Sequence, residues 1–292
     1  MLKDSPMLRV IAAAGSALVL FCGAAGAAAL PPQAKAPEKV RIVEPQMHIT
    51  RGGPGAPQVA LTLDACMGKT DHRILDTLVK ERIPATIFVT GRWLKLNAEA
   101  FAVMKAHPDL FQIEDHGAMH IPAVTSEPTV FGLRSAGSLD AVRAEIDGGT
   151  AAIEAAGGAR PQWYRDATAR YSTDAVKLIE QMGYRIAGYS LNGDIGASLP
   201  APMVERRIAA ARDGDVIISH INQPSRSAGE GVAKGVTDLK AKGVKFVLLK
   251  DVQTTLTLNP VPEHNHYART AKPKRATIKP AITKPAAATT GQ

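Results

Sequence analysis

The sequence predicts an α/β fold built on a parallel sheet of about seven strands. Between residues 58 and 252, short apolar runs typical of buried strands alternate with segments whose apolar residues recur at helical spacing. Such alternation is typical of parallel α/β architecture. Polar residues follow several of the strand-type runs directly, and parallel α/β folds collect their functional side chains at those strand ends. Periodicity alone leaves an open sheet and a closed barrel as alternatives.

The first strand is expected at 59–63, where the run Val-Ala-Leu-Thr-Leu reads as buried. The helix after it is expected to begin at a cap on Thr70, because apolar residues at helical spacing follow that threonine. The next helix is expected to open at Asn97, and Ser138 is expected to cap another after the irregular stretch 121–138. The remaining elements are expected as strands at 84–90, from 111, at 162–165, 185–191, 216–219 and 245–249, and as helices at 97–107, 139–156, 173–182, 201–211 and 231–242.

The N-terminal residues 1–29 have the order of an export signal. Two basic residues precede an apolar run at 10–21, and small residues then lead to Ala29. The apolar run is shorter than the ~20 residues that cross a bilayer, so a cleaved signal is favoured over a membrane anchor. A lipoprotein is excluded because Phe21 precedes Cys22. The sequence therefore predicts a periplasmic or secreted protein without a stable membrane span.

Removal of that segment leaves Cys66 as the only cysteine, so the mature chain has no internal disulfide. The fold must then rest on its apolar core, and residues 58–252 are long enough for one sizeable domain. Residues 30–57 are Pro-rich and are expected to form an extended lead.

Residues 253–292 are predicted to form a disordered basic tail. Within 262–292, six basic residues stand against one acid, so this segment carries +5 of the formal net charge of +8. Its Pro, Ala, Thr and Lys composition offers no apolar period to bury. The tail is either a solvated spacer or a segment attracted to an anionic envelope surface. A nucleic-acid-binding core is not expected, because the basic charge is not interleaved with aromatics on a folded face.

Two histidines follow the third predicted strand as an H-x-x-x-H pair, His116 and His120. If that segment turns helically, the four-residue spacing places both imidazoles on one face, where they can bind one divalent cation. The pair alone is a weak signal, because histidines four apart are often surface residues. The preceding Glu114 and Asp115 favour a site, since carboxylates orient ligating imidazoles.

Other polar residues follow strands in the same manner. Asp64 ends the first strand and His220 ends the strand at 216–219. A carboxylate base, a histidine pair for a metal and a separate imidazole acid together make up a metal-assisted hydrolase. The alternative is a protein that only binds a metal. The full set of candidate residues at strand ends is Asp64, His116, His120, Arg165, Asp194 and His220.

Four short motifs occur in an order that resembles the polysaccharide deacetylases of carbohydrate esterase family 4, the NodB homology proteins. The resemblance covers residues 57–252 and is specific for the superfamily rather than for a substrate. The motifs are Leu61-Thr62-Leu63-Asp64, His116-Gly117-Ala118-Met119-His120, Tyr164-Arg165 and Ile217-Ile218-Ser219-His220.

The resemblance implies a distorted (β/α) barrel, usually of seven strands, that holds a divalent metal of the Zn²⁺ type. It implies that His116 and His120 bind the metal and that Asp64 is the general base. Arg165 is implied to orient that base, and His220 to be the general acid. The implied reaction is hydrolysis of an acetamide on an N-acetylated glycan, which releases acetate and leaves a free amine.

The sequence departs from the family pattern after the base, where the family has a second aspartate as metal ligand and this chain has Ala65. Asp71 is the preferred substitute, and its alternative role is that of an acid at a helix N-terminus. Cys66 is a second candidate, either as a thiolate ligand or as a small buried residue. Asp115 is a third, more plausible behind the ligands than among them. Asp64 itself can also turn to the metal, which would leave the base unassigned.

The partner of His220 is expected to be Asp194, which would raise the pKa of that histidine. Three functions are compatible with these residues. The first is an exported metal-dependent N-deacetylase of a cell-envelope or extracellular glycan. The second is another amidohydrolase of non-peptide C–N bonds on the same barrel. The third is a non-catalytic glycan-binding relative, which would need neither Asp64 nor His220.

Overall fold

The computed structural model describes residues 39–50 and 55–262. The predicted export signal at 1–29 and the part of the predicted tail at 263–292 lie outside the described residues. Among the described helices, none has both the length and the apolar character needed to span a bilayer.

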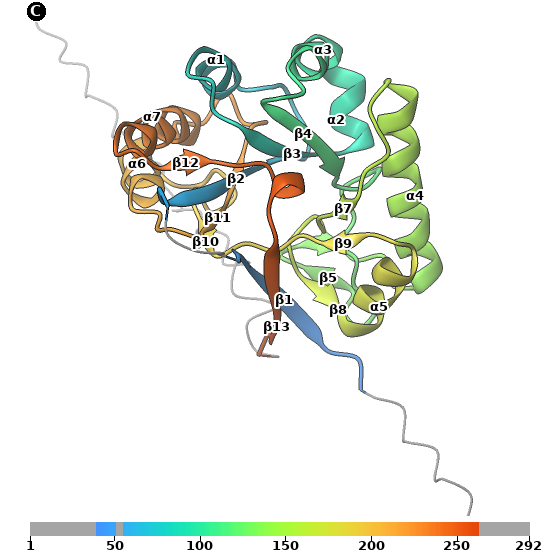
Figure 1. Cartoon of the computed structure of the whole chain (residues 1–292). Helices are drawn as coiled ribbons and strands as arrows, with labels where there is room; N and C mark the ends of the chain where they lie inside the picture. The colour runs from blue at the N-terminus through green and yellow to red at the C-terminus, as the bar shows by residue number, and fades with distance from the viewer. Residues whose placement is uncertain (1–38, 51–54, 263–292) are drawn as a thin grey trace, which may run out of the picture. The chain divides into compact units, whose positions relative to one another are not determined.

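The main sheet is a path of seven parallel strands in the order β10-β11-β2-β3-β4-β7-β9, and the short strand β12 pairs with β2 beside that path. This confirms the expected parallel α/β barrel, as a curled sheet whose end strands β10 and β9 do not pair with each other within the described residues (Figure 1). The strands are β2 (Gln58–Ala65), β3 (Ala85–Val89), β4 (Phe111–Asp115), β7 (Trp163–Tyr164), β9 (Arg185–Ile186), β10 (Leu191–Asn192), β11 (Val216–His220) and β12 (Lys245–Phe246).

Side chains alternate along β2 between two apolar cores. Leu61, Leu63 and Ala65 belong to the large cluster that the sheet forms with its covering helices. Ala60 belongs to a different cluster, which contains Phe88 and fills the other face of the sheet. The even-numbered positions of β2 therefore face the barrel interior, and this alternation carries Asp64 to the inner side.

Helices lie along the outer face of the sheet (Figure 1). Asp71 caps the first of them, rather than Thr70 as expected, because the Asp71 carboxylate accepts the Arg73 amide at 3.1 Å. Ser138 caps α4 as expected. The helices are α1 (His72–Lys80), α2 (Gly91–Leu96), α3 (Ala98–Ala106), α4 (Leu139–Ala155), α5 (Thr173–Gln181), α6 (Ala201–Ala209) and α7 (Ala228–Ala241).

A second, three-stranded sheet has the order β13-β1-β8 and corrects two expected boundaries. Strand β1 (Ile42–Ile49) lies in the predicted extended lead, and β13 (Thr254–Pro260) lies in the predicted disordered tail. The two strands pair antiparallel from Val43–Pro260 to Ile49–Thr254, and β8 is Tyr171–Ser172. Long-range pairing of backbone groups, and not apolar composition, orders residues 254–260.

The segment predicted as one strand at 185–191 is two strands, β9 and β10, with a break between them. Strand β1 crosses at the break: the Met47 amide donates to the Tyr189 carbonyl at 3.1 Å. Gly188 permits this approach, because a Cβ there would lie 2.3 Å from the Pro45 carbonyl oxygen. Further differences are the unexpected helix α2 and strand β8, the pair β5 (Thr129–Val130) and β6 (Leu133–Arg134) in the expected irregular stretch, and the short 3₁₀ turn Leu249–Asp251 after β12.

Candidate active site

The register of the parallel strands brings the predicted site residues to one edge of the sheet. His220 on β11 lies opposite Asp64 on β2. Asp64 lies opposite Phe88 on β3, and Val89 lies opposite Asp115 at the end of β4, directly before His116. Arg165 follows β7 and its amide donates to the Asp115 carbonyl at 2.9 Å. Side chains from sequence positions a hundred residues apart therefore meet at these strand ends.

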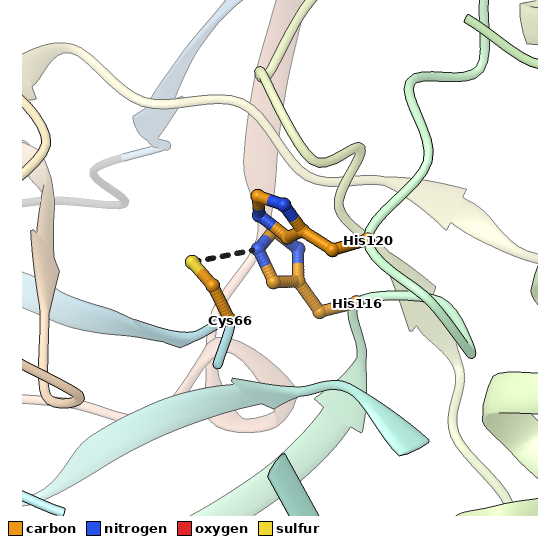
Figure 2. A group of neighbouring side chains, drawn as sticks. All are labelled: Cys66, His116 and His120. Atoms are coloured by element: carbon orange, nitrogen blue, oxygen red, sulfur yellow. Dashed lines mark hydrogen bonds between the residues drawn. The ribbon is translucent and has the colours of Figure 1, made fainter. Parts of the chain in front are cut away.

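Three of these side chains form a compact group: Cys66, His116 and His120. Each of the three residues offers one possible ligand atom, and these three atoms all lie within 4.8 Å of one another. Figure 2 shows the thiol after β2 and the imidazoles after β4 and from its following loop, all pointing toward one another. The Cys66 Sγ is 3.5 Å from His116 Nε2, and the two imidazole rings meet edge to face at 5.0 Å between centroids.

The hydrogen bonds of the two imidazoles leave donor atoms for a metal. His116 Nδ1 lies 2.8 Å from the Arg165 carbonyl oxygen, which can only accept, so Nδ1 carries the proton and Nε2 faces Cys66. Both ring nitrogens of His120 are buried and make no hydrogen bond. Buried polar atoms are normally paired, so this orphaned imidazole indicates a ligand. One thiolate and two imidazoles are a donor set that suits Zn²⁺.

Electrostatics favour the ionised thiol in this group. Burial raises the pKa of Cys66, but the His116 and His120 imidazoles outweigh burial and bring that pKa well below its usual range. For His116 burial acts in the opposite direction and lowers the pKa, but Asp64 and Cys66 together raise that pKa to about 9. The negative charge of the thiolate and of Asp64 thus attracts positive charge to the centre of the group.

Asp64 is held by an arginine that is itself fully buried. The Arg165 Nη1 donates to Asp64 Oδ1 and to Thr62 Oγ1, each at 2.9 Å, and its Nη2 donates to the Gly188 carbonyl. The other carboxylate oxygen of Asp64 lies 3.9 Å from His116 Nε2. Burial raises the pKa of Asp64, but Arg165, His116 and His220 bring it below its ordinary value. Asp64 is therefore a carboxylate near neutral pH.

His220 is held by Asp194, as expected from the sequence. The His220 Nδ1 lies 2.9 Å from Asp194 Oδ1, and the His220 backbone amide donates to Asp194 Oδ2 at 2.7 Å. Asp194 is fully buried, and its carboxylate raises the pKa of His220 well above the ordinary histidine value although burial lowers it. The imidazole side chain retains 18% exposure toward the solvent.

Asp71, the preferred third metal ligand, is not brought to the histidines. Its carboxylate caps α1 and forms a two-pronged contact with Arg73, at 2.9 Å to Nε and 2.5 Å to Nη2. These bonds use the acid in the helix-cap role that the sequence also allowed. Asp115 lies behind the ligands: its Oδ1 accepts the Gly117 amide at 2.6 Å, and burial raises its pKa to about 7.

Ala65, where the family pattern has its second aspartate, faces away from the site into the large helix-covered core and is fully buried. Replacing Ala65 with aspartate is therefore expected to bury a carboxylate among Leu61 and Leu63. We expect a loss of ~2–5 kcal/mol in the free energy of unfolding, measured by urea titration, with no gain in zinc affinity. The same change at the exposed Ala98, at the start of α3, is the control and should be nearly neutral. Tighter zinc binding by Ala65→Asp would contradict this orientation.

The group opens into a cavity of about 480 Å³ whose lining includes Asp64, Cys66, His120 and His220. A second cavity of about 380 Å³ adjoins it. Three residues line both cavities and contact one another: Glu44 accepts hydrogen bonds from Arg170 Nε at 3.1 Å and from the Tyr189 hydroxyl. The candidate active site is thus part of a longer depression on the surface.

Sequence reasoning did not find Glu44, because its place beside the site depends on the β1–β13 pairing. It also did not find Glu145 of α4, whose carboxylate binds the loop between the two histidines. Cys66 was named but not preferred, although alternation along a strand could have favoured it: residues 64 and 66 share a face and residue 65 does not. The tryptophans Trp93 and Trp163 are buried in the cores, so neither presents a ring to a sugar.

The class that this fold and site define is supported by comparison with known proteins. The polysaccharide deacetylase family model matches residues 51–187, which include Asp64, His116, His120 and Arg165. This match confirms the resemblance to the polysaccharide deacetylases of carbohydrate esterase family 4. His220 and Asp194 lie beyond the matched residues, where the similarity to known proteins rests on the fold alone.

Individual relatives are distant. An uncharacterised Bacillus subtilis protein, YlxY, is 22% identical over 212 residues, and the match spans 69% of this chain but only 61% of that protein. A family 4 pseudoenzyme from Bacillus anthracis is 21% identical, with a TM-score of 0.54 over 68% of this chain and 66% of its own. A family 4 carbohydrate esterase from Streptomyces lividans, solved with acetate, is 18% identical with a TM-score of 0.53 over 67% and 94%. The same fold therefore carries both enzymes and pseudoenzymes.

Proposed function

We propose that this chain is a metal-dependent N-deacetylase that hydrolyses acetamide groups on an N-acetylated glycan. One observation carries the proposal: the Asp64 carboxylate, held by Arg165, and the His220 imidazole, held by Asp194, line the same cavity as Cys66 and His120. A protein that only binds a metal or a glycan has no use for a base and an acid placed in this way.

Cys66, His116 and His120 would hold the metal, for which Zn²⁺ fits the sulfur and nitrogen donors. A divalent ion bound there supplies Lewis-acid polarisation of the carbonyl and lowers the pKa of water. The His116 imidazole is held in ligand orientation by its Nδ1 contact with the Arg165 carbonyl. The third ligand that Ala65 does not provide is thus supplied by the next residue in the chain.

Asp64 acts as the general base and takes one proton from the attacking water. The buried Arg165 keeps this carboxylate ionised and fixes its direction, since the guanidinium donates to Oδ1 and leaves Oδ2 toward His116. The oxygen of the water forms the new bond to the acetamide carbon, and the C–N bond then breaks.

His220 acts as the general acid and gives a proton to the departing nitrogen. Asp194 occupies Nδ1, so Nε2 is the nitrogen that exchanges a proton with the substrate. One water is consumed for each acetate and amine formed, and the pair returns to its starting state when the proton that Asp64 has taken passes to His220, directly or through solvent.

The substrate class is inferred from the family and from the two adjoining cavities. A depression that continues past the Glu44–Arg170–Tyr189 contact suits a chain of sugars better than a small cyclic amide. We also propose that the protein works outside the cytoplasm, because residues 1–29 have the order of an export signal.

Asp194→Asn is expected to move the alkaline limb of the pH–rate profile to lower pH. His220 must be protonated to act as an acid, so the rate falls as pH rises through its pKa. Burial lowers that pKa, and the Asp194 carboxylate is the largest of the contributions that raise it, so removal of its charge should lower the pKa of His220. We expect a shift of ~1–3 pH units in kcat/KM. Asp76→Asn, which removes an exposed carboxylate on α1, is the control. An alkaline limb at the same pH in Asp194→Asn and wild type would exclude His220 as the acid.

The proposed function is tested by acetate release from N-acetylated chitooligosaccharides before and after treatment with a chelator. We expect release that is lost with the metal and returns with added Zn²⁺ or Co²⁺. Release that is insensitive to the chelator would favour a metal-free amidohydrolase. No release from these sugars or from peptidoglycan with any divalent metal, although the chain still binds the glycan, would favour a non-catalytic relative.

A further inference from the structure

The loop between the two ligand histidines is fixed by one buried side chain of α4. Glu145 Oε1 accepts the Met119 amide at 2.8 Å and the Ile121 amide at 3.1 Å. These are the backbone N–H groups of the two residues next to His120 in the chain. The backbone carbonyl of Glu145 also accepts the Ala118 amide at 2.9 Å. One residue on a covering helix therefore binds three backbone groups of this loop.

His120 needs such support because its backbone is in the left-handed region, with a φ of +67°. A non-glycine residue in that region costs ~1–3 kcal/mol where the surrounding structure holds it in place. An ordinary hydrogen bond contributes ~0.5–1.5 kcal/mol, so the two bonds to Glu145 are comparable in size to this cost even without the contribution of its charge. No hydrogen bond holds the His120 ring itself, because both of its nitrogens are unpartnered.

Glycines give Glu145 access to the loop. Gly117 has a φ of +87°, and a Cβ there would lie 2.4 Å from Glu145 Oε1. Gly149, one turn further along α4, lets the helix approach so closely that a Cβ would lie 2.2 Å from Asp115 Oδ1. The helix, the loop and the acid behind His116 thus pack as one unit around the carboxylate of Glu145, which is 5% exposed.

We propose that Glu145 is a positioning residue that presets His120 for metal binding through the Met119 and Ile121 amides. The inference rests on the proposed metal site and adds a residue outside it. Glu145 does not touch the metal; it fixes the peptide group that follows His120 and the peptide group that precedes Met119. A ligand that is already in place binds without an ordering cost, so the effect of Glu145 appears as metal affinity.

Two conservative substitutions separate the two properties of this side chain. Glu145→Gln keeps the length and one carbonyl oxygen but removes the charge. Glu145→Asp keeps the charge but is one methylene shorter and cannot reach both amides. Glu145→Ala removes both properties, and Glu154→Ala is the control on the same helix, where the side chain is 45% exposed.

The readout is Zn²⁺ affinity of the full chain, measured by competition with a chromophoric chelator, together with the visible absorption of the Co²⁺ form. We expect Glu145→Asp and Glu145→Ala to weaken zinc binding ~10–100-fold, as loss of residues that orient metal ligands does. Glu145→Gln should stay within ~3-fold of wild type and keep the wild-type Co²⁺ spectrum, while Glu154→Ala should be unchanged.

Wild-type affinity in folded Glu145→Asp would overturn the inference while leaving the metal site intact. A loss in Glu145→Gln as large as that in Glu145→Asp would overturn it as well, because the Gln variant still reaches both amides and the loss would then not follow from that reach. Where Glu145→Ala does not fold, the Gln and Asp pair decides. A wild-type chain that binds no zinc would instead refute the metal site itself, and the inference with it.

Discussion

Replacing Cys66 with serine should abolish tight zinc binding. The thiol is the only sulfur in the group with His116 and His120, and both imidazoles lower its pKa so that it binds as a thiolate. A neutral hydroxyl offers a far weaker donor. Loss of residues that merely orient ligands costs ~10–100-fold in metal affinity, so loss of the ligand itself should exceed ~100-fold. Zinc content after dialysis and chelator competition both measure this.

Asp71→Asn is the matched comparison, because Asp71 was the preferred ligand on sequence grounds. The carboxylate of Asp71 caps α1 and binds Arg73, and asparagine caps a helix as well as aspartate does. This variant should therefore keep its zinc and lose at most ~1 kcal/mol of stability, through the lost ion pair with Arg73. The opposite pattern, zinc retained by Cys66→Ser and lost by Asp71→Asn, would return the third ligand to Asp71 and leave Cys66 as a small buried residue.

Asp64→Asn should reduce acetate release ~10²–10⁴-fold at saturating zinc, the range expected for loss of a general base. Asparagine preserves an oxygen for the Arg165 guanidinium, which is 2.9 Å from Asp64 Oδ1, so the site should stay assembled. The variant leaves the buried Arg165 without its counter-charge, and we expect a lower unfolding temperature. The rate is measured as kcat/KM on an N-acetylated chitooligosaccharide.

Zinc affinity of the same variant distinguishes the two roles open to Asp64. If Asp64 is the base, Asp64→Asn should weaken zinc binding less than ~10-fold. This loss is smaller than the usual cost of replacing a residue that orients a metal ligand. As a fourth ligand, its replacement would remove zinc and activity together. Activity within tenfold of wild type at unchanged zinc content would mean that another group takes the proton.

The strand-end positions of the site were predictable from the sequence because they follow from local pattern. Each apolar run predicts a buried strand, and parallel strands bring their carboxyl ends together, so Asp64, His116, Arg165 and His220 had to lie at one edge. The His220–Asp194 contact followed in the same manner. These parts needed only the register of neighbouring strands.

The rest depends on contacts between distant parts of the chain. Pairing of β1 with β13 joins residues 42–49 to residues 254–260, and the local pattern of neither segment says that the other is its partner. That pairing delivers Glu44 to the cavity wall. The reach of Glu145 to the loop of His120 depends on how α4 packs, which no local pattern encodes. Side-chain direction decides between Cys66 and Asp71 as third ligand. Cys66 points inward from the end of β2 toward the two histidines, whereas Asp71 caps α1.

X-ray absorption spectroscopy at the zinc edge of the loaded wild-type protein tests the metal centre most directly. We expect one sulfur at ~2.3 Å and imidazole nitrogens at ~2.0–2.1 Å, with the sulfur absent in Cys66→Ser. A spectrum of the wild type with only oxygen and nitrogen neighbours would contradict a centre built on Cys66, His116 and His120.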